Sequence, residues 1–267
     1  MTRSSRLLLF CLALITPASA QSGTPTPTTA PPPPQLQGED SDPTRPVVWS
    51  LREEYYNLRG SDAWANAFIV RRDKAFFEDR KEWWTGKRGF ITRFDMPLVV
   101  THNPVETQGG LGDLYLQALY FPHLTRKFAF AGGTGMLLPT ATDELLGTGK
   151  VTIAPALAPV WFIPRRGMFF IKLQDFVSVA GDDSRPDLHY FTTNPLLTWS
   201  FQKKWWTQLD GETKTNFQTG GNSGYRVGVL LGRVLKNRFG AWVKVEVPFG
   251  KYREGDVSIK TSLFRVK

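Results

Sequence analysis

Three histidines are the side chains of this sequence that could most directly carry catalysis. They are His102, His123 and His189, and a membrane lipid hydrolase would pair one of them with a serine and a polar orienting group. None lies in a recognisable motif: His102 opens a loop, His123 lies beside a short turn, and His189 falls on the outward face of a strand. Cys11 is the only cysteine and no two histidines are closely spaced, so no zinc-type ligand pattern is present. We therefore predict no catalytic residue, no metal and no cofactor.

Acidic and glycine-rich segments offer two further kinds of chemistry, and each has a simpler explanation. Two acidic pairs are predicted in loops, where they could bind calcium or bridge lipopolysaccharide through divalent ions: Asp143 with Glu144, and Asp182 with Asp183. Solvated loop charge is the simpler interpretation. The segment Gly132–Gly135 has the composition of a phosphate loop, but no helix or lysine follows in the required place. A strand of small residues facing a crowded interior explains it better.

Charged residues alternate with apolar ones along several segments, and this pattern carries the main chemical prediction. Val243 and Val245 fall on one face of an extended strand, while Lys244 and Glu246 fall on the other. Inward charge on this scale does not fit a dry core, so we expect the charged face to line the interior of a barrel. The predicted lumen-lining residues are Arg93, Asp95, Asp113, Tyr115, Gln117, Lys172, Gln174, Asp210, Glu212, Lys214, Lys244 and Glu246.

Short strands are the elements that must position these residues. From Val47 onward the sequence lacks helical periodicity and gives stretches of about 9 to 14 residues that are rich in aromatic, Val, Thr and Leu residues. This length suits a tilted strand that crosses an outer membrane. We predict an all-β fold, a transmembrane antiparallel up-and-down β-barrel of about twelve strands: 47–58, 64–73, 88–101, 112–125, 127–140, 150–164, 168–180, 187–201, 205–217, 224–235, 239–249 and 256–267.

The predicted connections alternate between short and long. Four short turns begin at Thr125, Arg165, Gln202 and Lys236. The connections at the opposite end of the strands are longer: 103–111, 141–149, 181–186, 218–223 and 251–255. Short periplasmic turns and longer outer loops are typical of outer-membrane barrels, which places the C-terminus in the periplasm. The connection 74–87 is long on the periplasmic side. Either it forms a small interfacial helix, or the first two strands are misplaced.

A soluble lipocalin-like barrel or a β-sandwich would also show short alternating strands. Outward aromatic residues near strand ends favour the membrane barrel, because aromatic girdles lie at both membrane interfaces. These residues are Tyr120, Trp199, Phe201, Trp205 and Phe249. Twelve strands leave an interior between the filled eight-stranded and the open sixteen-stranded barrels. The inward charges therefore either pair structurally or serve conduction and selectivity, and both interpretations stay open.

The N-terminal region predicts export from the cytoplasm. Residues 1–20 have the charged start, short apolar core and small-residue ending of a secretory signal peptide, which we expect to be cleaved before Gln21. Residues 21–46 are rich in Pro and Thr and predict a disordered linker, and residues 47–267 form the barrel. The net charge is +9, but export argues against a nucleic-acid partner. The rest of the sequence has no run of 18 apolar residues, so it predicts no inner-membrane helix.

A resemblance to a known family rests on three stretches of sequence. These are Gly112-Asp113-Leu114-Tyr115-Leu116, the glycine-rich segment from Gly132 to Pro139-Thr140, and Gly147-Thr148-Gly149. From about Arg52 onward, the chain resembles the outer-membrane β-barrels grouped as meta-pathway phenol degradation or transporter-like proteins. It departs from their common pattern at Ala141, where a glycine often follows Pro-Thr. The resemblance implies an outer-membrane location in a Gram-negative bacterium and passage of hydrophobic or aromatic compounds, with no catalytic residues.

Two functions remain as hypotheses. The first is a passive channel or binding barrel for small hydrophobic or aromatic solutes, which is not an enzyme. The second is a plugged structural or interaction barrel that contacts partners through its outer loops or its N-terminal tail. A membrane lipid hydrolase is a third and weaker hypothesis. The expected partners are outer-membrane lipid, lipopolysaccharide and the barrel-assembly machinery.

Overall fold

The computed structural model describes residues 47–58, 62–77, 87–125, 127–164, 166–201, 204–235 and 238–266. The predicted signal peptide and linker lie outside these residues, as does most of the predicted 74–87 connection with its interfacial helix. No helix in the described part of the chain is long and apolar enough to cross a membrane.

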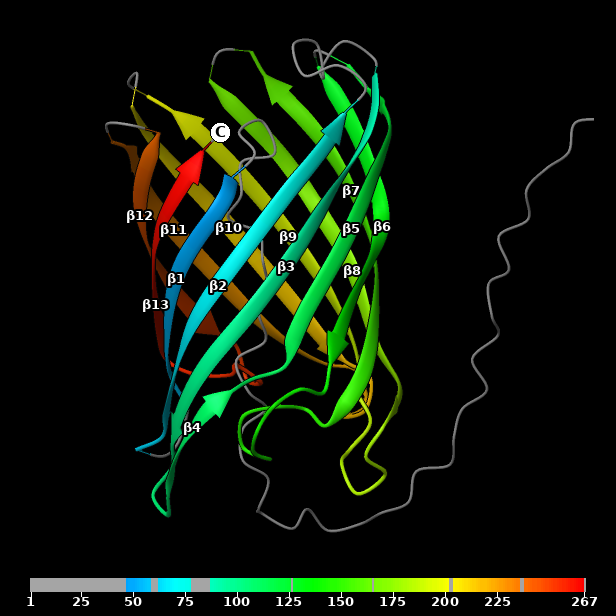
Figure 1. Cartoon of the computed structure of the whole chain (residues 1–267), viewed down its shortest axis with the longest axis vertical. Coiled ribbons are helices and arrows are strands. Elements are labelled where there is room, and N and C mark those ends of the chain that lie inside the picture. The colour runs from blue at the N-terminus through cyan, green and yellow to red at the C-terminus, as the bar shows by residue number, and fades with distance from the viewer. Residues whose placement is uncertain are drawn as a thin grey trace, which may run out of the picture.

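Antiparallel strands make up the fold (Figure 1). They are β1 (Val47–Asn57), β2 (Trp64–Phe77), β3 (Lys87–His102), β4 (Thr107–Leu111), β5 (Leu114–Leu124), β6 (Phe128–Leu138), β7 (Lys150–Ile163), β8 (Gly167–Gly181), β9 (His189–Ser200), β10 (Trp205–Asn216), β11 (Asn222–Val234), β12 (Phe239–Phe249) and β13 (Val257–Val266). Except for β4 and β5, neighbours along the chain pair with each other, and β1 pairs with β13, so the sheet closes on itself. The structure is therefore a closed barrel.

The barrel wall has twelve positions because β4 and β5 share one of them. Both strands pair with β3, β4 through Leu98–His102 and β5 through the residues from Asp95 back to Lys87. Gly112 and Asp113 separate the two strands. The prediction of an all-β, twelve-stranded antiparallel barrel is confirmed.

One predicted loop is partly wrong. The connection 103–111 was expected to be loop, but Thr107–Leu111 forms β4. The turn before it is tight, because the Asn103 side chain accepts hydrogen bonds from the backbone N–H groups of Val105 (2.8 Å) and Glu106 (2.9 Å). The Thr-Gln-Gly-Gly-Leu segment has little intrinsic strand preference, so its strand conformation comes from pairing with β3.

The first two strands lie where the sequence places them. β1 and β2 pair in continuous register from Ser50 opposite Arg71 to Asn57 opposite Trp64. β2 runs to Phe77, further than the predicted end at residue 73. The alternative that these strands were misplaced is therefore wrong.

The two ends of the barrel differ. The C-terminal end of β13 lies at the same end as the short turns after β5, β7, β9 and β11, whereas the longer connections and β4 lie at the opposite end (Figure 1). We call these the short-turn end and the long-loop end. Side chains alternate between a buried interior face and an exposed outer face, as in β12, where Val243 and Val245 are exposed and Lys244 and Glu246 are buried.

Glycines make room for large interior rings at the short-turn end. A Cβ atom on Gly240 of β12 would lie 2.1 Å from Cζ of Phe264, its partner on β13. A Cβ atom on Gly232 of β11 would lie 2.4 Å from the Trp206 ring of β10. Each ring therefore covers a neighbouring backbone that has no side chain of its own.

We predict that Gly240→Ala displaces the Phe264 ring and lowers the free energy of unfolding by about 1–3 kcal/mol, as overpacking does. Urea unfolding of the refolded protein in lipid vesicles measures the change. Gly132→Ala is the matched control, because its Cβ atom would meet its nearest neighbour, Leu157, at an ordinary 3.4 Å. Equal effects of the two substitutions would contradict the prediction.

Candidate functional site in the barrel interior

The barrel interior gathers all twelve residues that the sequence predicts there. Eleven of them are buried and Lys214 is half-buried. The interior as a whole has three layers along the strands: apolar near the short-turn end, charged in the middle, and aromatic near the long-loop end. The interior also holds charged residues that the sequence-based selection omitted: Arg52, Glu54, Arg71, Asp73, Lys150, Arg226 and Lys260.

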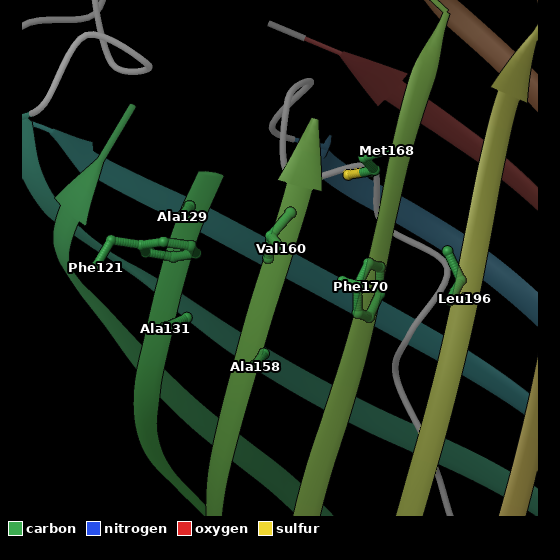
Figure 2. Packing of buried hydrophobic residues seen from close by; sticks show 8 residues of the cluster. All are labelled: Phe121, Ala129, Ala131, Ala158, Val160, Met168, Phe170 and Leu196. Carbon is green, nitrogen blue, oxygen red and sulfur yellow. The ribbon is translucent and has the colours of Figure 1, made fainter. Parts of the chain in front are cut away.

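The layer near the short-turn end is apolar. Figure 2 shows its larger cluster, which β5 to β9 contribute: Phe121, Ala129, Ala131, Ala158, Val160, Met168, Phe170 and Leu196. A second cluster comes from β11 to β13 and consists of Leu230, Trp242 and Phe264, with Trp206 of β10 packed against it. The end of the barrel that carries the C-terminus is thus lined by apolar side chains.

The charged layer begins with two crossed ion pairs between β2 and β3. Arg71 donates two hydrogen bonds to Asp95, both at 2.6 Å. Arg93 donates to Asp73 at 2.8 and 3.2 Å. Each pair joins residues that lie directly opposite in the strand register. The predicted residues Arg93 and Asp95 are therefore both held by residues of β2.

A chain of polar contacts then crosses six strands that are neighbours in the wall, in the order β1, β13, β12, β11, β10 and β9. The distances between successive side chains are 3.5, 3.1, 3.3, 2.8 and 2.8 Å, and all but the last are ion pairs. The chain runs from Glu54 through Lys260, Glu246, Arg226 and Glu212 to Asn194. Charges of alternating sign on adjacent strands reduce the cost of taking each one out of water.

A glycine allows a further ion pair to form between two strands that are not neighbours. The Nζ atom of Lys244 on β12 lies 2.9 Å from Oδ2 of Asp210 on β10, although β11 runs between them. Gly228 of β11 lies beneath this contact, and a Cβ atom there would come within 2.9 Å of Lys244 and 3.0 Å of Asp210. Lys244 also lies 2.8 Å from Glu246, so it serves two carboxylates.

The layer near the long-loop end is aromatic. The rings of Phe176 and Tyr190 stack with centroids 4.5 Å apart, and Nζ of Lys214 lies 4.6 Å from the centroid of the Tyr190 ring. The Tyr115 hydroxyl accepts hydrogen bonds from Gln117 (2.9 Å) and Gln174 (3.0 Å). The stacked rings and the neighbouring cation are therefore packed as a buried cluster, in which Phe176 is 6% and Tyr190 3% exposed.

The glycine-rich strand β6 has a specific structural role beside this layer. A Cβ atom on Gly135 would lie 2.4 Å from the Tyr115 hydroxyl, so glycine lets the tyrosine cross β6 and reach Gln174 of β8. The interpretation of Gly132–Gly135 as small residues in a crowded barrel agrees with this contact.

The connection between β6 and β7 folds into the barrel from the long-loop end. Leu146 is almost fully buried and packs with Ala67, Ile69 and Val99, which belong to the interior faces of β2 and β3. The loop therefore reaches past β5 and covers part of the interior. We call residues 139–149 the inward loop.

Asp113 holds the inward loop in place. Its Oδ1 atom accepts a hydrogen bond from the Ala141 backbone N–H (3.2 Å). Its Oδ2 atom accepts from the Thr148 backbone N–H (2.6 Å) and hydroxyl (2.8 Å). Gly147 packs so closely that a Cβ atom would lie 2.5 Å from this carboxylate. Ala141 stands where the common pattern of the resembling family has glycine, and the inward loop accommodates its methyl group.

The neighbouring loop braces the inward loop from outside. Arg185 donates hydrogen bonds to the carbonyl oxygens of Glu144 (2.7 Å) and Gly147 (2.8 Å). Lys150 lies 2.9 Å from Asp187, and its hydrogen bond and charge hold the pKa of Asp187 below the usual range. Because that pKa is lowered, the pair stabilises the fold at neutral pH and its contribution is lost as the pH falls through the lowered pKa.

The described histidines and the acidic loop residues make local contacts. His102 shares a hydrogen bond with the Thr107 hydroxyl, His189 lies 3.4 Å from Asp175, and the His123 side chain lies outside the described residues. Asp143 and Asp182 cap their own loops through Leu145 and Ser184. Within the described ranges, no group of three or more His, Cys, Asp or Glu residues could hold a metal ion.

The omitted residues carry a sequence signal. Arg52 and Glu54 have the same i, i+2 spacing as Lys244 and Glu246, so alternation alone places them on one face. Their ion pair at 2.5 Å lies within β1, whereas the link from Glu54 to Lys260 depends on the closure of β1 against β13. Sequence alternation therefore finds such residues, but only the closed barrel shows which ones meet.

We predict that Asp113→Asn frees the inward loop, because an amide has one acceptor oxygen where the carboxylate uses two, so either the bond from Ala141 or those from Thr148 are lost. Limited proteolysis of the refolded protein should then cut within residues 139–149 more rapidly. Asp143→Asn is the matched control in the same loop, where the side chain serves a local turn. If both variants resist cleavage as the unchanged protein does, Asp113 does not hold the loop.

We also predict that Glu246→Gln destabilises the barrel by about 3 kcal/mol, since it removes the anion shared by Lys244, Lys260 and Arg226. Urea unfolding measures this loss. Glu106→Gln makes the same change in the exposed turn before β4 and should have little effect. A neutral Glu246→Gln substitution would show that the polar chain does not contribute to stability.

No family model and no curated protein matches the chain. Solved structures do resemble it. The COG4313 outer membrane channel from Pseudomonas putida F1 has a TM-score of 0.62 at 11% identity, covering 85% of this chain and 99% of that one. The NanC porin has a TM-score of 0.55 at 9% identity, covering 82% and 99%. At such identities the likeness shows a shared fold, that of outer-membrane β-barrels, and the resemblance to the phenol degradation family stays a prediction.

Proposed function

We propose that this protein is a passive channel in the outer membrane of a Gram-negative bacterium. The observation that carries the proposal is the polar chain across β1 and β9 to β13, inside a barrel whose outer face is apolar. Apolar side chains could fill a purely structural barrel, and buried ion pairs are often no more stabilising than such packing. Charged interiors are common where solutes or ions pass.

The similar structures support this proposal. Those with the same fold include proteins named as an outer membrane channel and a porin. The alternation of short turns and long loops supports an orientation with the C-terminus and the short-turn end in the periplasm. In this orientation, the inward loop restricts entry from the outside of the cell.

Small hydrophobic or aromatic molecules are the solutes that we propose. The stacked rings of Phe176 and Tyr190 lie in the interior near the long-loop end, and the apolar layer lies near the short-turn end. Between them, the predicted lumen-lining residues would set selectivity.

A plugged structural or interaction barrel is the second candidate. The observation that favours it is the burial of the interior charges, because Glu54, Asp95 and Glu246 have no exposed surface. Such a barrel would fold and insert, yet it would not conduct.

Single-channel recording of the refolded protein in a planar bilayer separates the two candidates. A channel gives a steady conductance that benzoate reduces. A silent barrel that still shows heat-modifiable migration in gels is folded, and that result would favour the structural protein.

Lys172→Gln should shift the ion preference of the channel toward cations, because it removes a positive charge from the interior. The reversal potential in a salt gradient measures this preference. Arg72→Gln removes the same charge from the outer face and should leave the reversal potential unchanged. Arg93 is less suitable as a test, since its removal leaves the buried Asp73 without its paired guanidinium. An unchanged reversal potential in Lys172→Gln would remove Lys172 from the conduction path.

A further inference from the structure

Exposed charge at the short-turn end is entirely positive among the described residues. The exposed cations come from strand ends and short turns all round the barrel: Arg72, Lys74, Arg88, Lys127, Arg166, Lys204, Arg233, Arg238 and Arg265. No exposed Asp or Glu accompanies them in the described parts of this end. We call these nine residues the basic rim.

The long-loop end has the opposite character. Its described connections carry the exposed or half-buried acids Asp62, Glu106, Asp143, Glu144, Asp182, Asp183, Asp187, Glu254 and Asp256. The cations there are Arg185, Lys251 and Arg253, and two of these three pair with local acids: Arg185 with Glu144 and Arg253 with Asp256. The charges of the barrel surface are therefore separated along its axis.

Five cations of the basic rim lie against aromatic rings on the outer face. The distances from the cationic centre to the ring centroid are 4.7 Å for Arg72 with Trp49, 4.5 Å for Lys74 with Phe76, 5.9 Å for Arg166 with Trp199, 4.8 Å for Arg233 with Trp205 and 5.8 Å for Arg265 with Phe239. Aromatic rings at strand ends mark the interface between lipid and water. The rim cations are thus held at the depth of lipid headgroups.

The strands place apolar side chains next to the same cations. Leu263 lies two residues before Arg265 on the outer face of β13 and is 60% exposed, and Leu231 has the same relation to Arg233 on β11. A single molecule that contacts both the leucines and the cations must carry an apolar chain and an anionic group. A phospholipid has this structure, whereas an acidic protein would meet only the turn tips.

We propose that the basic rim binds the phosphate headgroups of anionic phospholipids in the leaflet at the short-turn end. The inference rests on the proposed membrane placement and does not depend on conduction. Guanidinium groups suit phosphate because their paired donors match its oxygens. A cation near an anionic membrane surface contributes about 1 kcal/mol, so each one removed weakens binding roughly fivefold.

The test is native mass spectrometry of the full protein in detergent, titrated with phosphatidylglycerol and with phosphatidylcholine. The unchanged protein should retain phosphatidylglycerol preferentially. The double variant Arg166→Gln with Arg233→Gln should lose most of that preference. The double variant Arg166→Lys with Arg233→Lys keeps the charge and should keep much of the preference. The control, Lys251→Gln with Arg253→Gln, removes two cations from the long-loop end and should behave like the unchanged protein.

Three results would overturn the proposal. They are equal retention of the two lipids by the folded protein, equal losses in the rim and control variants, and binding of soluble polyglutamate at the rim in place of phosphatidylglycerol. The last result would assign the rim to an acidic protein partner. Single-channel recording on the same samples keeps the two proposals apart, because a silent barrel that prefers phosphatidylglycerol contradicts only the channel.

Discussion

Closure of the backbone hydrogen-bond ladder is the constraint on which the rest of this structure depends. In hydrocarbon every backbone N–H and C=O group needs a partner within the protein, so the sheet must end where it begins, at the pairing of β1 with β13 and of β2 with β3. Closure fixes one face of each strand toward the outside of the barrel and the other toward the interior. A register slip of one residue would turn Lys244 and Glu246 outward. The difference between the two faces therefore specifies the register strongly.

The interior must then accommodate many charges in little space. It does so by pairing directly opposite residues, as between Arg71 and Asp95, and by linking charges of alternating sign from strand to strand. Glycines determine where side chains can cross a neighbouring strand. Gly228 lies beneath the contact of Lys244 with Asp210, and Gly135 lies beneath Tyr115. The same glycines would weaken a strand in isolation, so their benefit arises only from the tertiary contacts above them.

The inward loop and the basic rim give the two ends of the barrel different surfaces. At the long-loop end, one carboxylate, Asp113, orders a loop over the interior by accepting three hydrogen bonds. At the short-turn end, cations and rings alternate around the outer face. Each feature gathers residues from segments that are distant in the chain, because the strands of the wall bring their ends together at one end of the barrel or the other.

The sequence by itself determined the strand class, the number of strands in the wall and the face of each predicted interior residue, because a period of two survives in any extended strand that separates lipid from polar groups. It did not determine β4, whose residues adopt a strand only through β3. It placed Asp113 inside but could not show the loop that Asp113 holds, and alternation alone could not match Glu54 to Lys260. These features needed the tertiary structure, because they depend on contacts between segments whose distance in space is set by barrel closure and not by spacing along the chain.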